Sequence, residues 1–394
     1  MKKFLALLLA LVMSLSLVAC GGGDDTAADG GADAEDGGNA ETAAYQVAMI
    51  TDYGDITDQS FNQTTYEACQ EFCDAEGLQF EYYKPAGDST AERVAMVDAA
   101  VADGYNVIVM PGYAFAETIK ETAELYPDVT FIALDVAQGD LGEDYTVPSN
   151  VYCAVYQEEL CGYMAGYAAV KLGYTHLGVL GGMAVPAVQR FGYGFVQGAD
   201  AAAVEMGIAD QVVMEYAYGN QFFGDADITA VMDTWYQGGT EVVFACGGGI
   251  YTSAVDAAKK VGAKVIGVDV DQAGVIAKYA GVDGMTVTSA MKGLYPATYD
   301  TLTDVIVNGN WDKYVGKIAT LGLVSGTDPE ANYVQIPMGD GTQWSDSFTQ
   351  DDYKAMVKDM FDGKITVSNN TSSDVSAADF ATVITVDDQG SIKG

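Results

Sequence analysis

Acidic, aromatic and glycine-rich segments follow short apolar runs at several places along the chain. They comprise residues 52–62, 111–113, 135, 182–183, 218–223, 247–249 and 269–272. Ionised carboxylates accept hydrogen bonds from hydroxyl and N–H groups, and aromatic rings stack on flat molecules. Asp, Asn and Gly are also ordinary turn and cap residues, so each segment alone is equally consistent with a structural role. Their joint recurrence favours recognition of a small polar ligand.

Motifs of common catalytic and phosphate-binding sites are absent from the sequence. The run 247–249 has neither the GxGxxG spacing nor a Walker lysine, and no GxSxG or HExxH occurs. The single histidine, His176, lies in a predicted helix-to-strand turn, where we expect a surface or capping residue. We therefore expect no enzymatic activity, no cofactor and no metal; a surface-anchored enzyme is the remote alternative.

The elements that position these segments are predicted from apolar runs of strand length that alternate with longer helical patterns. The predicted strands are 46–51, 79–83, 106–110, 130–134, 177–181, 211–216, 241–245, 264–268 and 285–288. The predicted helices are 59–75, 89–103, 114–125, 157–171, 187–206, 226–238, 250–261 and 292–307. This alternation indicates α/β architecture with parallel sheets, which bind ligands at the carboxyl ends of their strands. Because so many strands exceed one comfortable sheet, we expect two lobes.

The length of the chain indicates the number of domains, and its net charge excludes one class of partner. The chain has 394 residues, with 18 Lys and Arg against 56 Asp and Glu, and a formal net charge of −38. At about 150 residues per domain, this length predicts two or three domains. The only arginines are Arg93 and Arg190, whereas phosphate backbones require clustered cations. We expect no nucleic-acid partner.

The first residues have the pattern of an export signal. Lys2 and Lys3 precede an apolar run over 4–19 that is short for a transmembrane helix, and Cys20 follows directly. The pattern resembles a bacterial lipobox, in which residues 1–19 are a signal peptide and Cys20 is lipidated. An ordinary secretory signal with an incidental Cys is the alternative. The acidic stretch 20–44, poor in apolar residues, is expected to be a flexible tether.

Five further cysteines follow Cys20. An odd number argues against a complete disulfide framework, so we expect mostly buried, small apolar side chains. They are Cys69, Cys73, Cys153, Cys161 and Cys246.

Four motifs occur in the order and spacing of a known family. Residues 58–62 (DQSFN) resemble its DxSFN signature, and 181–195 resemble its GGM…P…RF…GF pattern. Residues 265–272 (VIGVDVDQ) are close to VIGVDxDQ, and 288–292 (TSAMK) resemble TSxxK. The chain thus resembles the basic membrane protein (PnrA-like) family, bacterial substrate-binding lipoproteins of ABC transporters.

The resemblance implies a type I periplasmic-binding-protein fold, with two doubly wound parallel-sheet lobes joined by a hinge. We expect the N-terminal lobe to comprise 45–151 and about 289–320. The C-terminal lobe would then comprise 152–288 and about 321–375, followed by a tail over 376–394.

The resemblance further implies a nucleoside, most plausibly a purine nucleoside, bound between the lobes. Asp52 would face the base, Phe61 would stack on it, and Asn62 of the same motif would be a further contact. A second aromatic ring is expected from the segment 218–223, most plausibly Phe222, with Phe223 as the alternative because this segment departs from the usual family spelling.

The ribose would be bound by Asp269 and Lys292, since a carboxylate accepts hydrogen bonds from vicinal hydroxyl groups and an ammonium group donates them. Asp135 is a weaker candidate, and Gly248 would let the backbone approach the ligand. If Asp269 is not the contact, Asp271 is the next candidate.

Ordinary structural roles stand beside these assignments. Phe61 could be a core residue, Lys292 a solvated surface lysine, and Asp269 only a turn or cap residue. For Arg190 and Phe191, packing between the lobes and ligand contact are equally consistent with the sequence.

Partners and location follow from the same resemblance. We expect a monomeric receptor held at the outer face of a bacterial cell membrane by its lipid, which delivers its ligand to ABC permease subunits. A receptor of the same fold for a sugar or another small polar solute is the alternative. Two aromatic faces favour a nucleobase over a sugar.

Overall fold

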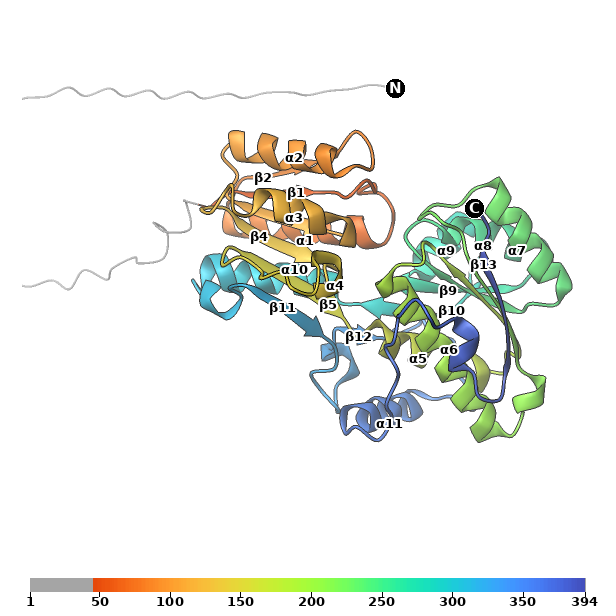
Figure 1. Cartoon of the computed structure of the whole chain (residues 1–394). Coiled ribbons are helices and arrows are strands. Elements are labelled where there is room, and N and C mark those ends of the chain that lie inside the picture. Colours follow the sequence, from red (N-terminus) through yellow and green to blue (C-terminus); the bar gives the residue numbers. More distant parts are fainter. Residues whose placement is uncertain (1–44, 394) are drawn as a thin grey trace, which may run out of the picture. The chain divides into compact units, whose positions relative to one another are not determined.

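The computed structural model describes residues 45–393, which form two sheets covered by helices (Figure 1). The predicted signal peptide, the lipidation of Cys20 and the tether 20–44 lie outside the described residues.

The first sheet has the strand order β11-β5-β4-β3-β1-β2 and is parallel throughout. Its strands are β1 (Val47–Ile50), β2 (Phe80–Tyr83), β3 (Val107–Pro111), β4 (Thr130–Leu134), β5 (Val151–Tyr156) and β11 (Lys317–Leu321). The second sheet has the order β12-β10-β9-β8-β6-β7-β13, with only β12 antiparallel to its neighbour. Its strands are β6 (His176–Gly181), β7 (Val213–Tyr218), β8 (Val242–Cys246), β9 (Lys264–Asp269), β10 (Thr286–Lys292), β12 (Val334–Gln335) and β13 (Thr385–Ser391).

The two sheets repeat one topology. The order β2-β1-β3-β4-β5 in the first corresponds to β7-β6-β8-β9-β10 in the second. In each sheet the first strand of the series lies between the second and the third, which is the switch point at which α/β sheets bind ligands. The repeat makes β4 equivalent to β9, and β5 equivalent to β10.

Helices cover both faces of each sheet. In the first lobe, α1 (Phe61–Glu76) and α10 (Leu294–Leu302) pack on one face, and α2 (Thr90–Ala102) and α3 (Ala116–Thr122) pack on the other. In the second lobe, the two faces carry α5 (Glu158–Lys171) with α6 (Pro186–Met206), and α7 (Ala226–Gly238) with α8 (Tyr251–Val261) and α9 (Ala273–Ala280). The remaining helical segments are α4 (Gln138–Leu141), α11 (Gln350–Phe361), the 3₁₀ turns η2 (Tyr113–Phe115), η3 (Ala209–Gln211), η5 (Trp311–Lys313), η6 (Pro329–Ala331) and η7 (Ala377–Phe380), and the π-helical η4 (Thr303–Val307).

Alternate residues of a strand enter different cores, because successive side chains point to opposite faces of a sheet. In β1, Val47 and Met49 pack with α1, whereas Ala48 and Ile50 pack with α2 and α3. Both faces are therefore apolar, as the continuous apolar runs predict for a doubly covered parallel sheet. The five cysteines after Cys20 are free and buried, as expected.

The chain passes between the lobes at Gln157, at Gly293 and over residues 322–333. The first passage was expected at about 151, but β5 extends to Tyr156 and pairs with β4 and β11. The return was expected at about 289, but β10 continues beside β9 to Met291. The strand β5 (VYCAVY) is an apolar run that the strand prediction omitted, whereas main-chain pairing with β9 carries β10 beyond its apolar residues.

The expected tail 376–394 is also corrected, because it contains η7 and β13, and β13 pairs in parallel with β7. The sequence of β13, TVDDQGS, is polar and is held by main-chain hydrogen bonds to an edge strand, so it lacks an apolar signal. All nine predicted strands and eight predicted helices overlap an observed element, whereas the strands β5, β11, β12 and β13 and the helices α4, α9 and α11 were missed. Within residues 45–393, no helix combines the length and apolarity needed to cross a membrane.

Candidate ligand-binding site

A cavity of about 360 Å³ lies at the carboxyl ends of strands from both sheets. All of the principal ligand contacts proposed from the sequence line it. These residues are Asp52, Phe61, Asn62, Asp135, Phe222, Gly248, Asp269 and Lys292. Arg190 and Phe191 line it as well, whereas Asp271 does not. Such a volume is in the range of small-molecule sites.

The start of α1 is organised by Asp58. Its carboxylate accepts hydrogen bonds from the backbone N–H groups of Ser60 (2.9 Å), Asn62 (2.9 Å) and Gln63 (3.1 Å). These donors have no partner inside the helix, so Asp58 acts as its cap. The cap fixes the first turn and with it Phe61, which lines the cavity. Sequence reasoning quoted Asp58 within the motif without recognising this positioning role.

Asp52 and Asn62 lie beside each other at the end of β1. The Asp52 carboxylate accepts hydrogen bonds from the N–H groups of Tyr53 and Gly54, both at 2.7 Å. A Cβ at Gly54 would lie 2.2 Å from the Asn62 Nδ2 atom, so a larger residue there would displace the Asn62 amide. Asn62 Oδ1 is buried and has no hydrogen-bond partner in the protein, which leaves it as an acceptor for a ligand.

Asp135 and Asp269 occupy equivalent positions in the repeat, directly after β4 and at the end of β9. Both have left-handed backbone conformations, with φ of 62° and 65°. Each carboxylate contacts a residue of the other lobe. The Ser60 hydroxyl donates to Asp269 Oδ2, and the Lys292 ammonium group lies 2.5 Å from Asp135 Oδ2. The second Asp135 oxygen, Oδ1, is buried without a partner in the protein.

Lys292 is the centre of a buried ion network rather than a surface lysine. Its side chain is 2% exposed, and its Nζ lies 2.5 Å from Asp135 and 2.9 Å from Glu158. The other Glu158 oxygen accepts a hydrogen bond from Arg190 Nε at 2.6 Å. Lys292 also lies over the rings of Phe61 (5.1 Å) and Tyr156 (4.9 Å). Glu158 was not among the predicted contacts; the available signal was its position two residues after the apolar run 151–156.

The buried charges of this network shift one another's pKa values. Burial alone would lower the pKa of Lys292, but Asp135, Glu158 and Asp269 outweigh burial and raise it, so the ammonium group stays charged. Burial likewise opposes ionisation of Glu158, yet Arg190 and Lys292 lower its pKa below the usual value. For Asp269 burial prevails over Lys292 and Ser60 and raises the pKa to about 6. Burial also raises the pKa values of Asp52 and Asp135.

The aromatic side chains differ in how firmly they are held. Phe222 packs against the hydrophobic core, and a Cβ at Gly182 would lie 2.4 Å from its ring. Phe223 also lines the cavity but is 58% exposed. Phe191 is buried in the core, with Lys292 5.8 Å from its ring centre. Phe222 is therefore better held than Phe223 to present a ring to a ligand.

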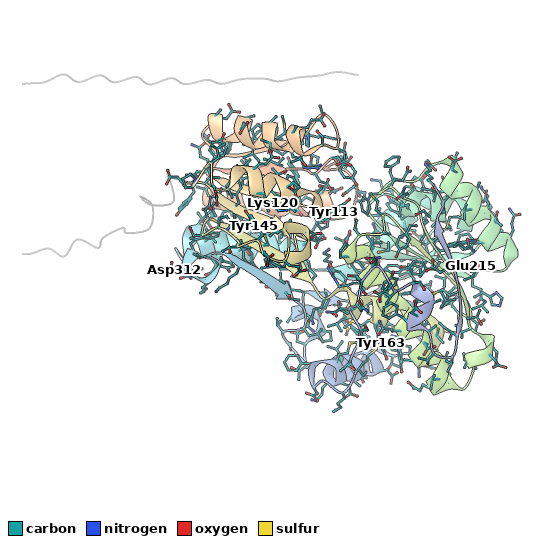
Figure 2. All side chains as sticks on the ribbon, in the orientation of Figure 1. Tyr113, Lys120, Tyr145, Tyr163, Glu215 and Asp312 are labelled. Atoms are coloured by element: carbon teal, nitrogen blue, oxygen red, sulfur yellow. The ribbon has the colours of Figure 1, made fainter. Side chains whose placement is uncertain are left out.

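Two tyrosines of the first lobe meet the second lobe beside the cavity. The hydroxyl groups of Tyr53 and Tyr113 lie 3.5 Å and 3.7 Å from the Met183 sulfur. Tyr113, labelled in Figure 2, lies at the edge of the first lobe nearest the second. Gln272 adds a hydrogen bond to the Gln59 carbonyl oxygen at 3.1 Å. The two lobes are thus in contact around the cavity.

The cavity offers non-covalent contacts rather than an activated nucleophile. Cys246 lines it, but burial raises its pKa far above the usual value, so the thiol is neutral and weakly nucleophilic. Over residues 45–393, no group of three or more His, Cys, Asp or Glu side chains is arranged to hold a metal ion. Carboxylates, an amide, an ammonium group and aromatic faces can bind a polar molecule that has a flat ring.

Comparison with known proteins adds a family and a fold. The family model described as "ABC transporter substrate-binding protein PnrA-like" matches residues 45–329. A solved ABC transporter solute-binding protein from Aeropyrum pernix has a TM-score of 0.63 at 21% identity, over 82% of this chain and 87% of that one. This likeness confirms the expected type I periplasmic-binding-protein fold.

Two of the relatives that match by sequence illustrate the similarity. A protein of Lactococcus lactis named "ABC transporter nucleoside-binding protein BmpA" is 25% identical over 336 residues, which are 82% of this chain and 88% of the relative. A protein of Pyrococcus abyssi named as an uncharacterized lipoprotein is 26% identical over 337 residues, which are 82% of this chain and 75% of the relative.

Proposed function

Because this chain belongs to the PnrA-like family of ABC transporter substrate-binding proteins, we propose that it captures a free nucleoside, most plausibly a purine nucleoside, and delivers it to a permease. We propose a receptor without enzymatic activity, anchored through a lipid on Cys20 to the outer face of the membrane. The name of the Lactococcus lactis relative supports the ligand class, and the name of the Pyrococcus abyssi relative supports the anchor.

The observation that carries the proposal is that aromatic rings and buried carboxylates line the same cavity. A nucleobase has two π-faces, and we assign them to Phe61 and Phe222, at about 1–3 kcal/mol per stacked base. Asp52 and Asn62 lie next to each other and can bind the polar edge of the base through acceptor oxygens.

The ribose is assigned to the opposite group of side chains. The Asp269 carboxylate accepts hydrogen bonds from the 2′- and 3′-hydroxyl groups, and Lys292 donates one. The Lys292 ammonium group donates a hydrogen bond to Asp135 and forms an ion pair with Glu158, which leaves donor capacity for the sugar. Asp135 and the backbone at Gly248 complete the assignment.

The charge of the cavity favours nucleosides over nucleotides. Its lining contains six carboxylates, and each of its three cations, Lys84, Arg190 and Lys292, is already paired with a carboxylate. The six are those of Asp52, Asp55, Asp58, Asp135, Asp140 and Asp269. A phosphate group would meet excess negative charge without a free buried cation, which costs binding energy. We expect adenosine to bind more tightly than its 5′-monophosphate.

A thermal-shift screen tests the proposal. The ligand-free protein, with removal of bound ligand verified beforehand, is heated with nucleosides, free bases, nucleotides, pentoses and hexoses. A ligand that binds only the folded state stabilises it by RT ln(1 + [L]/Kd). We expect nucleosides to raise Tm more than their monophosphates do. A rise with sugars alone would establish a sugar receptor, and a flat screen would refute the proposed ligand class.

A further inference from the structure

We propose that the strand β13 and the following Lys393 position the aromatic loop, residues 219–225, that carries Phe222 into the cavity. The inference rests on the proposed function, since it concerns the same cavity. The family model matches only residues 45–329, so β13 and Lys393 lie outside that match. Lys393 does not line the cavity and is a positioning residue.

The pairing of β13 with β7 brings it to the start of the aromatic loop. Ser391 is in register with Tyr218, the last residue of β7. The N–H group of Ile392 then donates to the Tyr218 carbonyl oxygen at 2.8 Å. The chain after β13 therefore leaves the sheet at the same point as the loop does.

Lys393 joins the two ends of the loop. Its ammonium group pairs with the Asp225 carboxylate and donates to Gln221 Oε1 at 3.0 Å. Its carbonyl oxygen accepts from Asn220 Nδ2 at 3.3 Å. Asn220 has a left-handed backbone, with φ of 60°, at the first bend of the loop. Lys393, which follows β13, thus contacts three side chains that flank Phe222 and Phe223.

Hydrogen bonds inside the loop carry this restraint to the phenylalanines. Gln221 Nε2 donates to the Phe223 carbonyl oxygen at 2.8 Å and to Asp225 Oδ2 at 3.0 Å. On the other side, the N–H group of Gly249 donates to the Phe222 carbonyl oxygen at 2.9 Å. The loop is therefore held between the glycine-rich segment 247–249 and Lys393.

Loss of Lys393 is expected to loosen the loop without unfolding the lobe. Asp225 keeps its hydrogen bonds to the N–H groups of Asp227 and Ile228, both at 3.0 Å, and so continues to cap α7. The pKa of Asp225 is lowered to about 2, first by the Ile228 N–H group and then by Lys393. A loop that must become ordered when ligand binds lowers affinity, because ordering side chains costs conformational entropy.

Calorimetric titration of adenosine into the wild type, Lys393→Ala and Gln389→Ala tests the inference. Gln389 lies in the same strand but contacts Trp235 of α7, away from the cavity, and is the matched control. We expect Kd to rise about two- to tenfold in Lys393→Ala, from re-ordering one or two side chains, and to stay within about twofold in Gln389→Ala.

A double-mutant cycle tests whether Lys393 affects affinity through Phe222. In a Phe222→Ala background, adding Lys393→Ala should change Kd no further, because a positioning residue has no effect once its target ring is gone. An undiminished effect in that background would overturn the inference, as would wild-type affinity in Lys393→Ala.

Hydrogen exchange separates this inference from the proposed function, because it requires no ligand. We expect faster exchange of amides in residues 219–225 and at Gly249 in Lys393→Ala, with α11 unchanged. If the wild type binds no nucleoside, the proposed function fails while exchange still decides whether Lys393 orders the loop. Unchanged exchange in the loop would refute the positioning role.

Discussion

Asp135 and Asp269 share an uncommon backbone conformation at equivalent ends of two strands. Left-handed residues other than glycine cost about 1–3 kcal/mol and persist where the surroundings hold them. Here Lys292 holds the Asp135 carboxylate and Ser60 holds that of Asp269. Because both carboxylates line the cavity, the strained conformation aims acceptor groups at the ligand site from both lobes.

The substitution Asp269→Asn tests the ribose contact, since Asn tolerates the left-handed backbone while it removes the charge. We expect ribonucleosides to lose about 1.5–3 kcal/mol, the value of a hydrogen bond to a charged group. Their order by base should not change, and the preference for adenosine over 2′-deoxyadenosine should shrink. Calorimetry with adenosine, guanosine, uridine and 2′-deoxyadenosine measures this.

Asp271→Asn is the matched control, because Asp271 lies nearby, outside the cavity, and accepts from the Ala273 N–H group, as Asn also can. If Asp269→Asn binds every nucleoside as the wild type does, Asp269 is only a turn residue and the ribose contact lies elsewhere.

Stacking should act on all bases alike. We expect Phe61→Ala and Phe222→Ala each to weaken every nucleoside by a similar factor, at about 1–3 kcal/mol per stacked base. Phe223→Ala should have a smaller effect, because that side chain is 58% exposed. The same calorimetric series checks this, and an equal loss in Phe223→Ala would reassign the second ring.

At the scale of elements, the close contact between α5 and α6 fixes the carboxylates at the start of α5. A Cβ at Gly162 would lie 2.2 Å from the Phe191 carbonyl oxygen, and one at Gly194 equally close to that of Glu159. The two backbones therefore touch through glycines. Glu158 finds Arg190 and Lys292 in this contact, whereas Glu159 is 2% exposed and its Oε2 atom has no hydrogen-bond partner.

The buried Glu159 should make stability depend on pH. Burial raises its pKa from 4.5 to about 7, so the folded state holds the proton more tightly than the unfolded state does. Protonated Glu159 therefore contributes to the free energy of unfolding. This contribution, roughly 3 kcal/mol, is fully present below about pH 4.5 and is lost as the pH rises through about 7. We therefore expect the stability of Glu159→Gln, relative to that of the wild type, to increase as the pH is raised from 5 to 8.

Urea unfolding of both proteins at the two pH values measures the difference. Glu76→Gln, at the exposed end of α1, is the control for removing a carboxylate. An equal difference between Glu159→Gln and the wild type at pH 5 and pH 8 would contradict the prediction.

At the scale of the whole molecule, contacts between the lobes surround the cavity. Ser60 bonds Asp269, Gln272 bonds the Gln59 carbonyl oxygen, and Tyr53 meets Met183. Because these contacts bridge the lobes beside the cavity, motion of one lobe against the other would break them and widen the cavity. The proposed capture would depend on the lobes alone, whereas the proposed delivery would also require that the protein stay at the membrane.

Anchoring and binding should be separable. We expect Cys20→Ser to abolish lipidation and release the protein from membranes, because the lipid supplies the membrane affinity. Nucleoside affinity of the purified variant should equal that of the wild type, since Cys20 precedes the residues that line the cavity. Membrane fractionation and calorimetry measure the two properties; a variant that remains in the membrane fraction would refute the lipid anchor.

Local patterns in the sequence were sufficient for the alternation of strands and helices and for the carboxylates at the strand ends, whereas Phe61, Phe222 and Lys292 were carried over from the family resemblance. Each apolar run needs a core on both faces, and the polar residue that ends it must lie at the edge where parallel strands end. Asp52, Asp135 and Asp269 follow from this rule alone. Their contacts with a ligand remain predictions.

Tertiary structure alone decided the partners across long sequence separations. Glu158 meets Lys292 only because the equivalent strands β5 and β10 end at the same cavity, and Phe222 is distinguished from Phe223 only by what packs around each ring. The strand β13 is held by main-chain hydrogen bonds to β7, which any residues but proline can form. Side-chain composition carries no record of such pairing, and for that reason a segment expected to be a tail proved to be part of the second sheet.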